Sequence, residues 1–142
     1  PGLRAPRAVR EGVAGPTFAS VSDPSQLMAE IVARTREMVE LVNGGNVAVV
    51  VPDLMAEKVA DMFAEAGLAF GRASNTALDN GITIVPVSVV KGLELDGVVV
   101  VEPSDIVEAE AQGMRSLYVA LTRATQRLTI VHARPLPAPM IG

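Results

Sequence analysis

Two uninterrupted runs of mostly β-branched residues constrain this chain more than any other feature. Residues 46–51 and 98–101 contain almost no polar positions that would give a strand a solvent-facing side. A strand formed by either run is therefore expected to be buried on both faces, as in a parallel sheet covered by helices. The runs predict an α/β fold with a mainly parallel sheet flanked by helices, arranged in three layers.

The remaining patterns predict how helices and strands alternate along the chain. Asp23 and Pro24 are typical of a helix start, and the expected helix ends near Val42, before two glycines. Further helices are expected over residues 54–66, 104–112 and 114–124, and further strands over 17–21, 68–72, 82–87 and 127–132. Ligands of such sheets bind at the carboxyl ends of the strands, so function is expected there.

The length of 142 residues predicts one folded domain. We expect a connector over residues 1–22, the domain over 23–134, and a Pro-rich tail over 135–142 that leaves the fold. The sequence opens with Pro1 rather than Met, so we expect a piece of a longer protein.

Composition excludes several classes of site. The chain has no Cys and one His, which excludes disulfides, thiolate zinc sites and multi-histidine metal sites, and we expect no bound metal. The net charge of −4 argues against a free-standing nucleic-acid binder that acts through charge. No apolar run approaches the ~20 residues of a membrane span, so we expect a cytoplasmic protein without a membrane partner.

The first segment with candidate chemistry is Lys-Gly-Leu-Glu at residues 91–94, directly after the strand expected at 82–87. Gly92 lets the backbone approach a ligand closely, Lys91 supplies positive charge, and Glu94 supplies an acceptor carboxylate. Such a set suits a phosphorylated ligand with sugar hydroxyls. Taken alone, the segment favours a simpler interpretation, a turn with a solvated Lys and Glu.

The second segment is Tyr-Val-Ala-Leu-Thr-Arg-Ala at residues 118–124, at the end of an expected helix. Arg123 at the helix C-terminus can complement the helix dipole, which is worth about 0.3–1 kcal/mol. Its planar, permanently charged guanidinium also suits a transferring phosphoryl group, as in an arginine finger. Helix logic by itself favours the first role.

Together these two segments resemble motifs V and VI of the UvrD/Rep-type superfamily 1 helicases. The strands expected at 97–101 and 127–131 resemble those that follow the two motifs. The resemblance covers roughly residues 83–133, with a weaker match over 46–67. Within the family, the sequences of these motifs are most similar to those of HelD-like proteins, the motors that associate with bacterial RNA polymerase.

The resemblance implies a second RecA-like domain of P-loop NTPase-like fold, with ATP bound between it and a first RecA-like domain. By motif position, Glu94 would approach the nucleotide sugar, and Arg123 would be the catalytic residue at the γ-phosphate. Gly92 would keep the backbone close to ATP, and Lys91 would hold the motif V turn or add positive charge. Glu94 and Arg123 would then flank one cleft at the carboxyl ends of neighbouring strands.

The sequence contains neither a phosphate-loop motif nor a pair of Walker B carboxylates, so it holds at most half of an ATPase site. The implied partner is the N-terminal RecA-like domain of the same parent, where ATP with Mg²⁺ would bind. For the isolated chain, we expect neither ATP hydrolysis nor tight ATP binding. Enzymatic activity is expected of the parent, an ATP-dependent DNA helicase-like hydrolase.

The target of the parent stays open. Helicases of this family usually place a His-Ser pair before the motif V lysine, whereas this sequence has Ser88 and Val89, which leaves Ser88 as a candidate nucleic-acid contact. A HelD-like motor acting on RNA polymerase tolerates the missing His best. The alternatives are a UvrD/Rep-type repair helicase that translocates on single-stranded DNA, and a non-catalytic binding module on the same fold.

Overall fold

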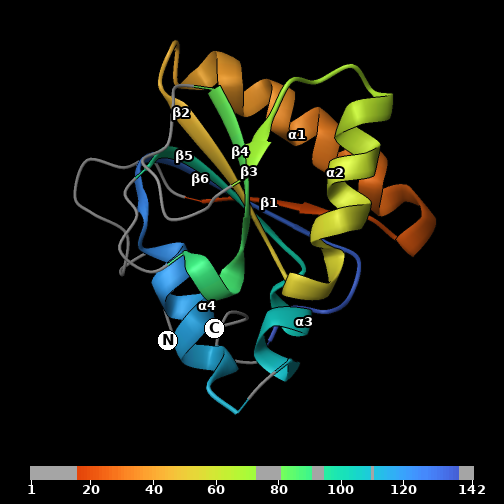
Figure 1. The fold of residues 1–142 in the computed structure, drawn as a ribbon. Coiled ribbons are helices and arrows are strands. Elements are labelled where there is room, and N and C mark those ends of the chain that lie inside the picture. Colours follow the sequence, from red (N-terminus) through yellow and green to blue (C-terminus); the bar gives the residue numbers. More distant parts are fainter. Residues whose placement is uncertain (1–15, 73–80, 91–94, 110, 138–142) are drawn as a thin grey trace.

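The computed structural model describes residues 16–72, 81–90, 95–109 and 111–137, in which a six-stranded sheet lies between two layers of helices (Figure 1). Every strand pair is parallel, and the strand order is β1-β6-β5-β2-β4-β3. The strands are β1 Thr17–Ser20, β2 Asn46–Val51, β3 Gly71–Arg72, β4 Gly81–Pro86, β5 Leu95–Val101 and β6 Ala124–His132. The predicted α/β fold with a parallel sheet flanked by helices is confirmed.

Two helices cover each face of the sheet (Figure 1). The helices are α1 Leu27–Leu41 and α2 Ala56–Glu65 on one face, and α3 Pro103–Glu108 and α4 Gly113–Leu121 on the other. Short 3-10 turns precede α1 and α2 and follow β4, at Pro24–Gln26, Asp53–Met55 and Val87–Val89. Among the described residues, no helix is both long and apolar enough to cross a membrane.

The β-branched run of β2 divides its side chains between the two faces. Val47, Val49 and Val51 pack into the core beneath α1 and α2. Ala48 and Val50 pack into the core beneath α3 and α4. All five side chains are fully buried, which is the burial on both faces that the sequence predicts.

The connections leave β2 and β5 in opposite directions along the sheet. From β2 the chain passes through α2 toward β3 and β4, whereas from β5 it passes through α3 and α4 to β6 on the other side. The segments at the carboxyl ends of β2 and β5 therefore diverge. Such a divergence is a topological switch point, where the sheet edge forms a crevice.

The expected helix at 114–124 ends earlier than the sequence predicts, and the last strand begins earlier. The Thr122 hydroxyl donates to the Val119 carbonyl at 2.9 Å, which closes α4 at Leu121. Strand β6 then starts at Ala124 rather than at residue 127. Leu95 and Gly97 are two residues apart in β5, but their partners Ala124 and Arg127 are three residues apart in β6, so β6 has a bulge here. The polar residues at this bulge lack the alternation that predicts a strand.

Three apolar side chains that the helical spacing assigns to the core are exposed. Tyr118 is 56% exposed, and Met114 is also exposed, because the buried face of α4 is formed by Gly113, Leu117, Ala120 and Leu121. The helical spacing predicts Tyr118 on the core face of the helix, and this prediction is wrong. Leu41, at the end of α1, is exposed to a similar degree as Tyr118.

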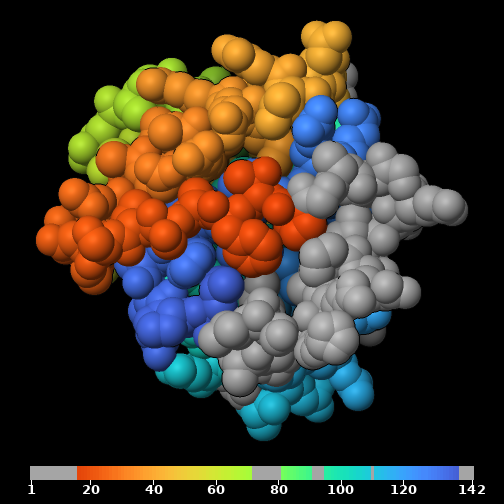
Figure 2. Space-filling view, turned by 180° about the vertical axis from the view of Figure 1, so that it is seen from behind, coloured from red at the N-terminus to blue at the C-terminus, as the bar shows by residue number. Residues whose placement is uncertain are grey.

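Both ends of the described chain contact the domain. The predicted strand in the connector is confirmed as β1, which pairs with β6 and lies at the surface (Figure 2). At the other end, the Ser104 hydroxyl donates to the Pro135 carbonyl, and Leu136 packs against the core beneath α3 and α4. The chain thus still contacts the domain beyond the point at which the sequence predicts that the tail leaves. The rest of the predicted domain division stays a prediction.

The close approach of α3 and α4 generates a prediction about Gly113. A Cβ atom added there would overlap the Val107 carbonyl oxygen and lie 2.6 Å from the Ile106 carbonyl oxygen, and backbone atoms cannot yield cheaply. We expect Gly113→Ala to lower the free energy of unfolding by about 1–3 kcal/mol, measured by urea denaturation. The control is Gly71→Ala, where nothing lies within 4 Å. Equal stability of both variants would contradict the tight packing of α3 on α4.

Candidate functional site

Arg123 lies at the junction between α4 and β6 and is half-buried. Its Nε donates to the Val119 carbonyl at 3.1 Å, and its Nη2 donates to the Thr122 hydroxyl at 3.1 Å. The guanidinium thus caps the last turn of α4, which is the structural role that helix logic assigns to it. The same bonds hold its charge at a defined place on the edge of the sheet.

The start of β5 lies directly beside Arg123. The Leu95 amide donates to the Arg123 carbonyl at 3.0 Å, and Leu95 is the residue after Glu94 in the sequence. Lys91, Gly92 and Glu94 themselves lie outside the described residues. Their expected contacts with ATP therefore stay predictions, as does the catalytic role of Arg123.

Arg123 lies at the amino edge of the sheet, not at the carboxyl edge that we expected. In a parallel sheet each crossover helix returns from the carboxyl ends to the amino ends of the strands. Arg123 follows α4 and precedes β6, so it lies at the beginning of that strand. The first residue of β5, Leu95, lies at the same edge.

Asp96 ties together the amino ends of three strands at this edge. Its carboxylate accepts from the Asn46 amide at 2.9 Å and from Gln126 Nε2 at 3.0 Å, while its own amide donates to Asn46 Oδ1 at 2.9 Å. A Cβ atom at Gly45 would overlap this carboxylate. The sequence predicts no role for Asp96, although Gly45, interpreted only as part of a helix stop, is a signal of this close approach.

Glu102 is a buried carboxylate at the carboxyl end of β5. It is only 4% exposed and has a left-handed backbone, with φ of 46°. Its carboxylate accepts from the Ala133 amide at 3.2 Å and the Arg134 amide at 3.3 Å, beyond the end of β6. Burial raises the pKa of the Glu102 carboxyl, although the two amides counteract part of that effect.

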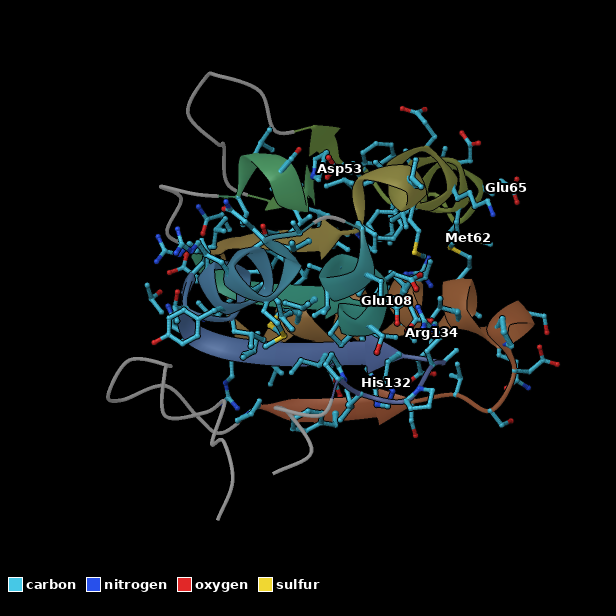
Figure 3. The ribbon with its side chains drawn as sticks, turned by 90° about the horizontal axis from the view of Figure 1, so that it is seen from below. Asp53, Met62, Glu65, Glu108, His132 and Arg134 are labelled. Carbon is cyan, nitrogen blue, oxygen red and sulfur yellow. The ribbon has the colours of Figure 1, made fainter. Side chains whose placement is uncertain are left out.

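Arg134 joins the same end of β6 to α3. Its guanidinium pairs with Asp105 and, at 2.7 Å, with Glu108 (Figure 3). This pairing lowers the pKa of the Glu108 carboxyl. Together with the hydrogen bonds that Glu102 accepts from two amides, these ion pairs fix the chain after β6 against α3.

A pocket of about 490 Å³ lies at the topological switch point. Its wall is formed by the segments that follow β2, β4 and β5: Pro52, Asp53, Leu54, Met55, Val87, Ser88, Asp105, Ile106, Glu108 and Ala109. The Ser88 amide donates to Asp53 Oδ1 at 3.1 Å, which joins two of these segments. Ser88 is thus placed at the carboxyl edge, and its role as a nucleic-acid contact stays a prediction.

Comparison with known protein families relates one part of the chain to helicases. Residues 81–131, from β4 to near the end of β6, match the model of the UvrD-like helicase C-terminal domain. A search of curated proteins finds no match. The matched segment contains both sequence motifs and the Leu95–Arg123 contact.

Solved structures share the fold across most of the chain. The C-terminal domain of a possible DNA helicase from Lactobacillus plantarum has a TM-score of 0.73 and 20% identity, covering 88% of this chain and 78% of that one. A SWI2/SNF2 ATPase core from Sulfolobus solfataricus in complex with double-stranded DNA (TM-score 0.63, 13% identity) matches over 84% of this chain. An arterivirus nonstructural protein 10 helicase with DNA (TM-score 0.55, 19% identity) matches over 87%. This chain spans 28% and 31% of the latter two, and the fold is the RecA-like fold of helicase domains.

The buried carboxyl of Glu102 generates a pH-dependent prediction. Because its pKa is raised above the ordinary 4.5, the folded state binds this proton more readily than the unfolded state. The contribution of Glu102 to stability therefore falls as pH rises from 4.5 through the raised pKa, by at most about 1.4 kcal/mol per pH unit. We expect Glu102→Gln, which cannot titrate, to gain stability relative to the wild type over that range.

Urea denaturation of both proteins from about pH 4 to about pH 7 measures this difference. Glu65→Gln, on the exposed surface of α2, is the matched control substitution. A Glu102→Gln variant whose stability differs from the wild type by the same amount at every pH would contradict the prediction.

Proposed function

We propose that this chain is the C-terminal RecA-like motor domain of a UvrD-like helicase and contributes half of a shared ATPase site. The observation that carries the proposal is the hydrogen bond from the Leu95 amide to the Arg123 carbonyl. It joins the end of one helicase-like motif to the arginine of the other, within the segment that matches the family model. This contact supports a shared ligand for Glu94 and Arg123, which are 29 residues apart in sequence (123 − 94).

In this proposal, Arg123 stabilises the charge that develops on the transferring γ-phosphoryl group. Its guanidinium is permanently charged and planar, and such arginines accelerate phosphoryl transfer by about 10³- to 10⁵-fold. The bonds to Val119 and Thr122 hold the side chain on α4 before the partner domain docks, which reduces the entropy lost on binding.

The motif V residues have complementary roles in the proposal. Glu94 accepts hydrogen bonds from the nucleotide sugar, Gly92 lets the backbone approach, and Lys91 adds positive charge near the phosphates. ATP with Mg²⁺ binds in the parent to the phosphate loop of the N-terminal RecA-like domain, where the metal ion neutralises the charge of the phosphates.

We further propose that the parent is HelD-like and acts on RNA polymerase. The support is the Ser88-Val89 sequence, which lacks the His-Ser pair usual in helicases that track single-stranded DNA. The alternative parent is a UvrD/Rep-type DNA repair helicase. A non-catalytic module of this fold is less well supported, because it has no need for both Glu94 and Arg123.

The role of Arg123 generates a kinetic prediction for the parent protein. We expect Arg123→Ala to lower the kcat of ATP hydrolysis by at least about 10³-fold, while ATP affinity changes much less. The matched control is Arg115→Ala on the same helix, which removes an exposed arginine and should leave kcat unchanged. Steady-state ATPase assays measure both variants, and the isolated 142-residue chain is expected to show no turnover.

Two results would contradict this half-site. Robust ATP hydrolysis by the isolated chain would mean that it holds a complete site. An unchanged kcat in the Arg123→Ala parent, with normal thermal unfolding, would leave Arg123 as a helix cap without a catalytic role.

The target of the parent generates a separate prediction. We expect the parent to co-purify with RNA polymerase and to show little stimulation of its ATPase by single-stranded DNA. Pull-down from a bacterial lysate, with identification of the polymerase subunits, and ATPase assays with an oligonucleotide distinguish the two targets. Strong stimulation by the oligonucleotide without polymerase binding would favour the repair helicase instead.

A further inference from the structure

The pocket at the switch point lies at the edge of the sheet opposite to Arg123. Segments that follow three parallel strands form its wall, and two of these segments, Asp53–Met55 after β2 and α3 after β5, lead away in opposite directions. This is the place in an open α/β sheet where ligands bind. Its volume of about 490 Å³ lies within the range of small-ligand sites. The resemblance to helicase motifs V and VI assigns no ligand to this pocket, apart from the nucleic-acid contact predicted for Ser88.

The wall of the pocket combines apolar surface with negative charge. Met55 supplies a half-buried apolar side chain, whereas Val87 and Ile106 are buried in the core behind the wall. Leu54 also lines the pocket and is 94% exposed, so its side chain extends into solvent. A partner that covers this side chain removes its apolar surface from water, which favours binding.

Three carboxylates line the same wall: Asp53, Asp105 and Glu108. Arg134 pairs with two of them, so the net charge of the four groups is −3 + 1 = −2. A phosphate placed here would be repelled, whereas a cation would be attracted. The ion pairs of Arg134 show that the α3 carboxylates are placed to bind a guanidinium.

Asp53 is held in position on the opposite side of the pocket. Its Oδ1 accepts the Ser88 amide at 3.1 Å, and it lies at the start of the turn before α2 (Figure 3). A carboxylate fixed by a backbone amide is ordered before a ligand arrives. This preorganisation lowers the entropy lost when a cation binds.

We propose that this pocket binds a basic segment of a partner protein, with an arginine or lysine side chain inserted between Asp53 and α3. The aliphatic stem of such a side chain suits Met55, and its charged end suits the carboxylates. Leu54 is covered by an apolar residue beside the inserted one, which a small free cation would not supply. This inference goes beyond the proposed ATPase role and does not depend on it.

The test uses the 142-residue chain and a defined peptide probe. The probe is a capped peptide in which one arginine lies between two leucines, and the matched probe carries citrulline, which is neutral and of nearly the same shape, in place of arginine. Backbone amide NMR shifts are followed up to about 5 mM peptide, since weak affinity is expected for so short a segment. We expect shifts confined to the segments that line the pocket.

Two variants test the two halves of the recognition. Asp53→Asn keeps the oxygen that accepts the Ser88 amide but removes the charge, and Leu54→Ser removes the exposed apolar side chain. We expect each to raise the Kd of the arginine peptide by about threefold or more, with citrulline causing a similar loss. The control Leu41→Ser changes an exposed leucine on α1, outside the pocket wall, and should leave the Kd unchanged.

Each other outcome overturns the proposal. Equal binding of the arginine and citrulline peptides would exclude recognition of charge, and an unchanged Kd in Leu54→Ser would exclude the apolar contact. An oligothymidylate that shifts the same amides more strongly than the peptide would make this edge a nucleic-acid contact around Ser88. No shift in the wild-type chain at the highest peptide concentration would also reject the site. Matching thermal unfolding of the variants verifies that they fold.

Discussion

The burial of β2 and β5 on both faces is the constraint from which the rest of the structure follows. Valines 47, 49 and 51 face one helical layer, and residues 48 and 50 face the other, so neither face of the strand tolerates water. Each buried valine contributes about 1.5–3 kcal/mol relative to exposure. Helices must therefore cover both sides, and the crossover helices that connect the parallel strands supply this cover. In a parallel sheet the amino ends of all strands lie at one edge and the carboxyl ends at the other, so different side chains gather at each edge.

The chemistry of these edges differs accordingly. The amino edge has Arg123 beside the start of β5, and Asp96 holds three strand ends in register. The carboxyl edge has a crevice lined by Asp53, Asp105 and Glu108, and the buried carboxylate of Glu102 lies at the same edge. The two proposals assign an anion to the first edge and a cation to the second. The two proposals thus concern different surfaces of one small domain.

The sequence predicted the elements whose patterns are local and failed where distant groups decide the structure. The β-branched runs, the start near Pro24 and the glycines after α1 were enough to predict strands and helices within a few residues. The bulge at the start of β6 lies beside a hydrogen bond between Gln126 and Asp96, which are 30 residues apart in sequence, and no local periodicity in the sequence predicts it. Tyr118 was misplaced because a helical face is a continuous arc, and which part of it is buried depends on the width of the sheet beneath. The amino edge that carries Arg123 follows from the predicted order of helix and strand in a parallel sheet, and the expectation was wrong because the general rule that ligands bind at the carboxyl ends was applied to it instead.

Strand β6 crosses the sheet between two arginines. Arg123 precedes the strand, and Arg134, whose amide donates to Glu102, follows it. The nine residues of β6 extend about 30 Å at the usual rise per residue, and the strand is hydrogen-bonded to β1 on one side and β5 on the other. Such a strand resists both stretching and sliding, since either would break ladders on two sides at once. This rigid strand has an arginine near each end. The ladders to β1 and β5 share any load on β6 with the neighbouring strands, so the backbone positions of Arg123 and Arg134 are held a fixed distance apart across the sheet.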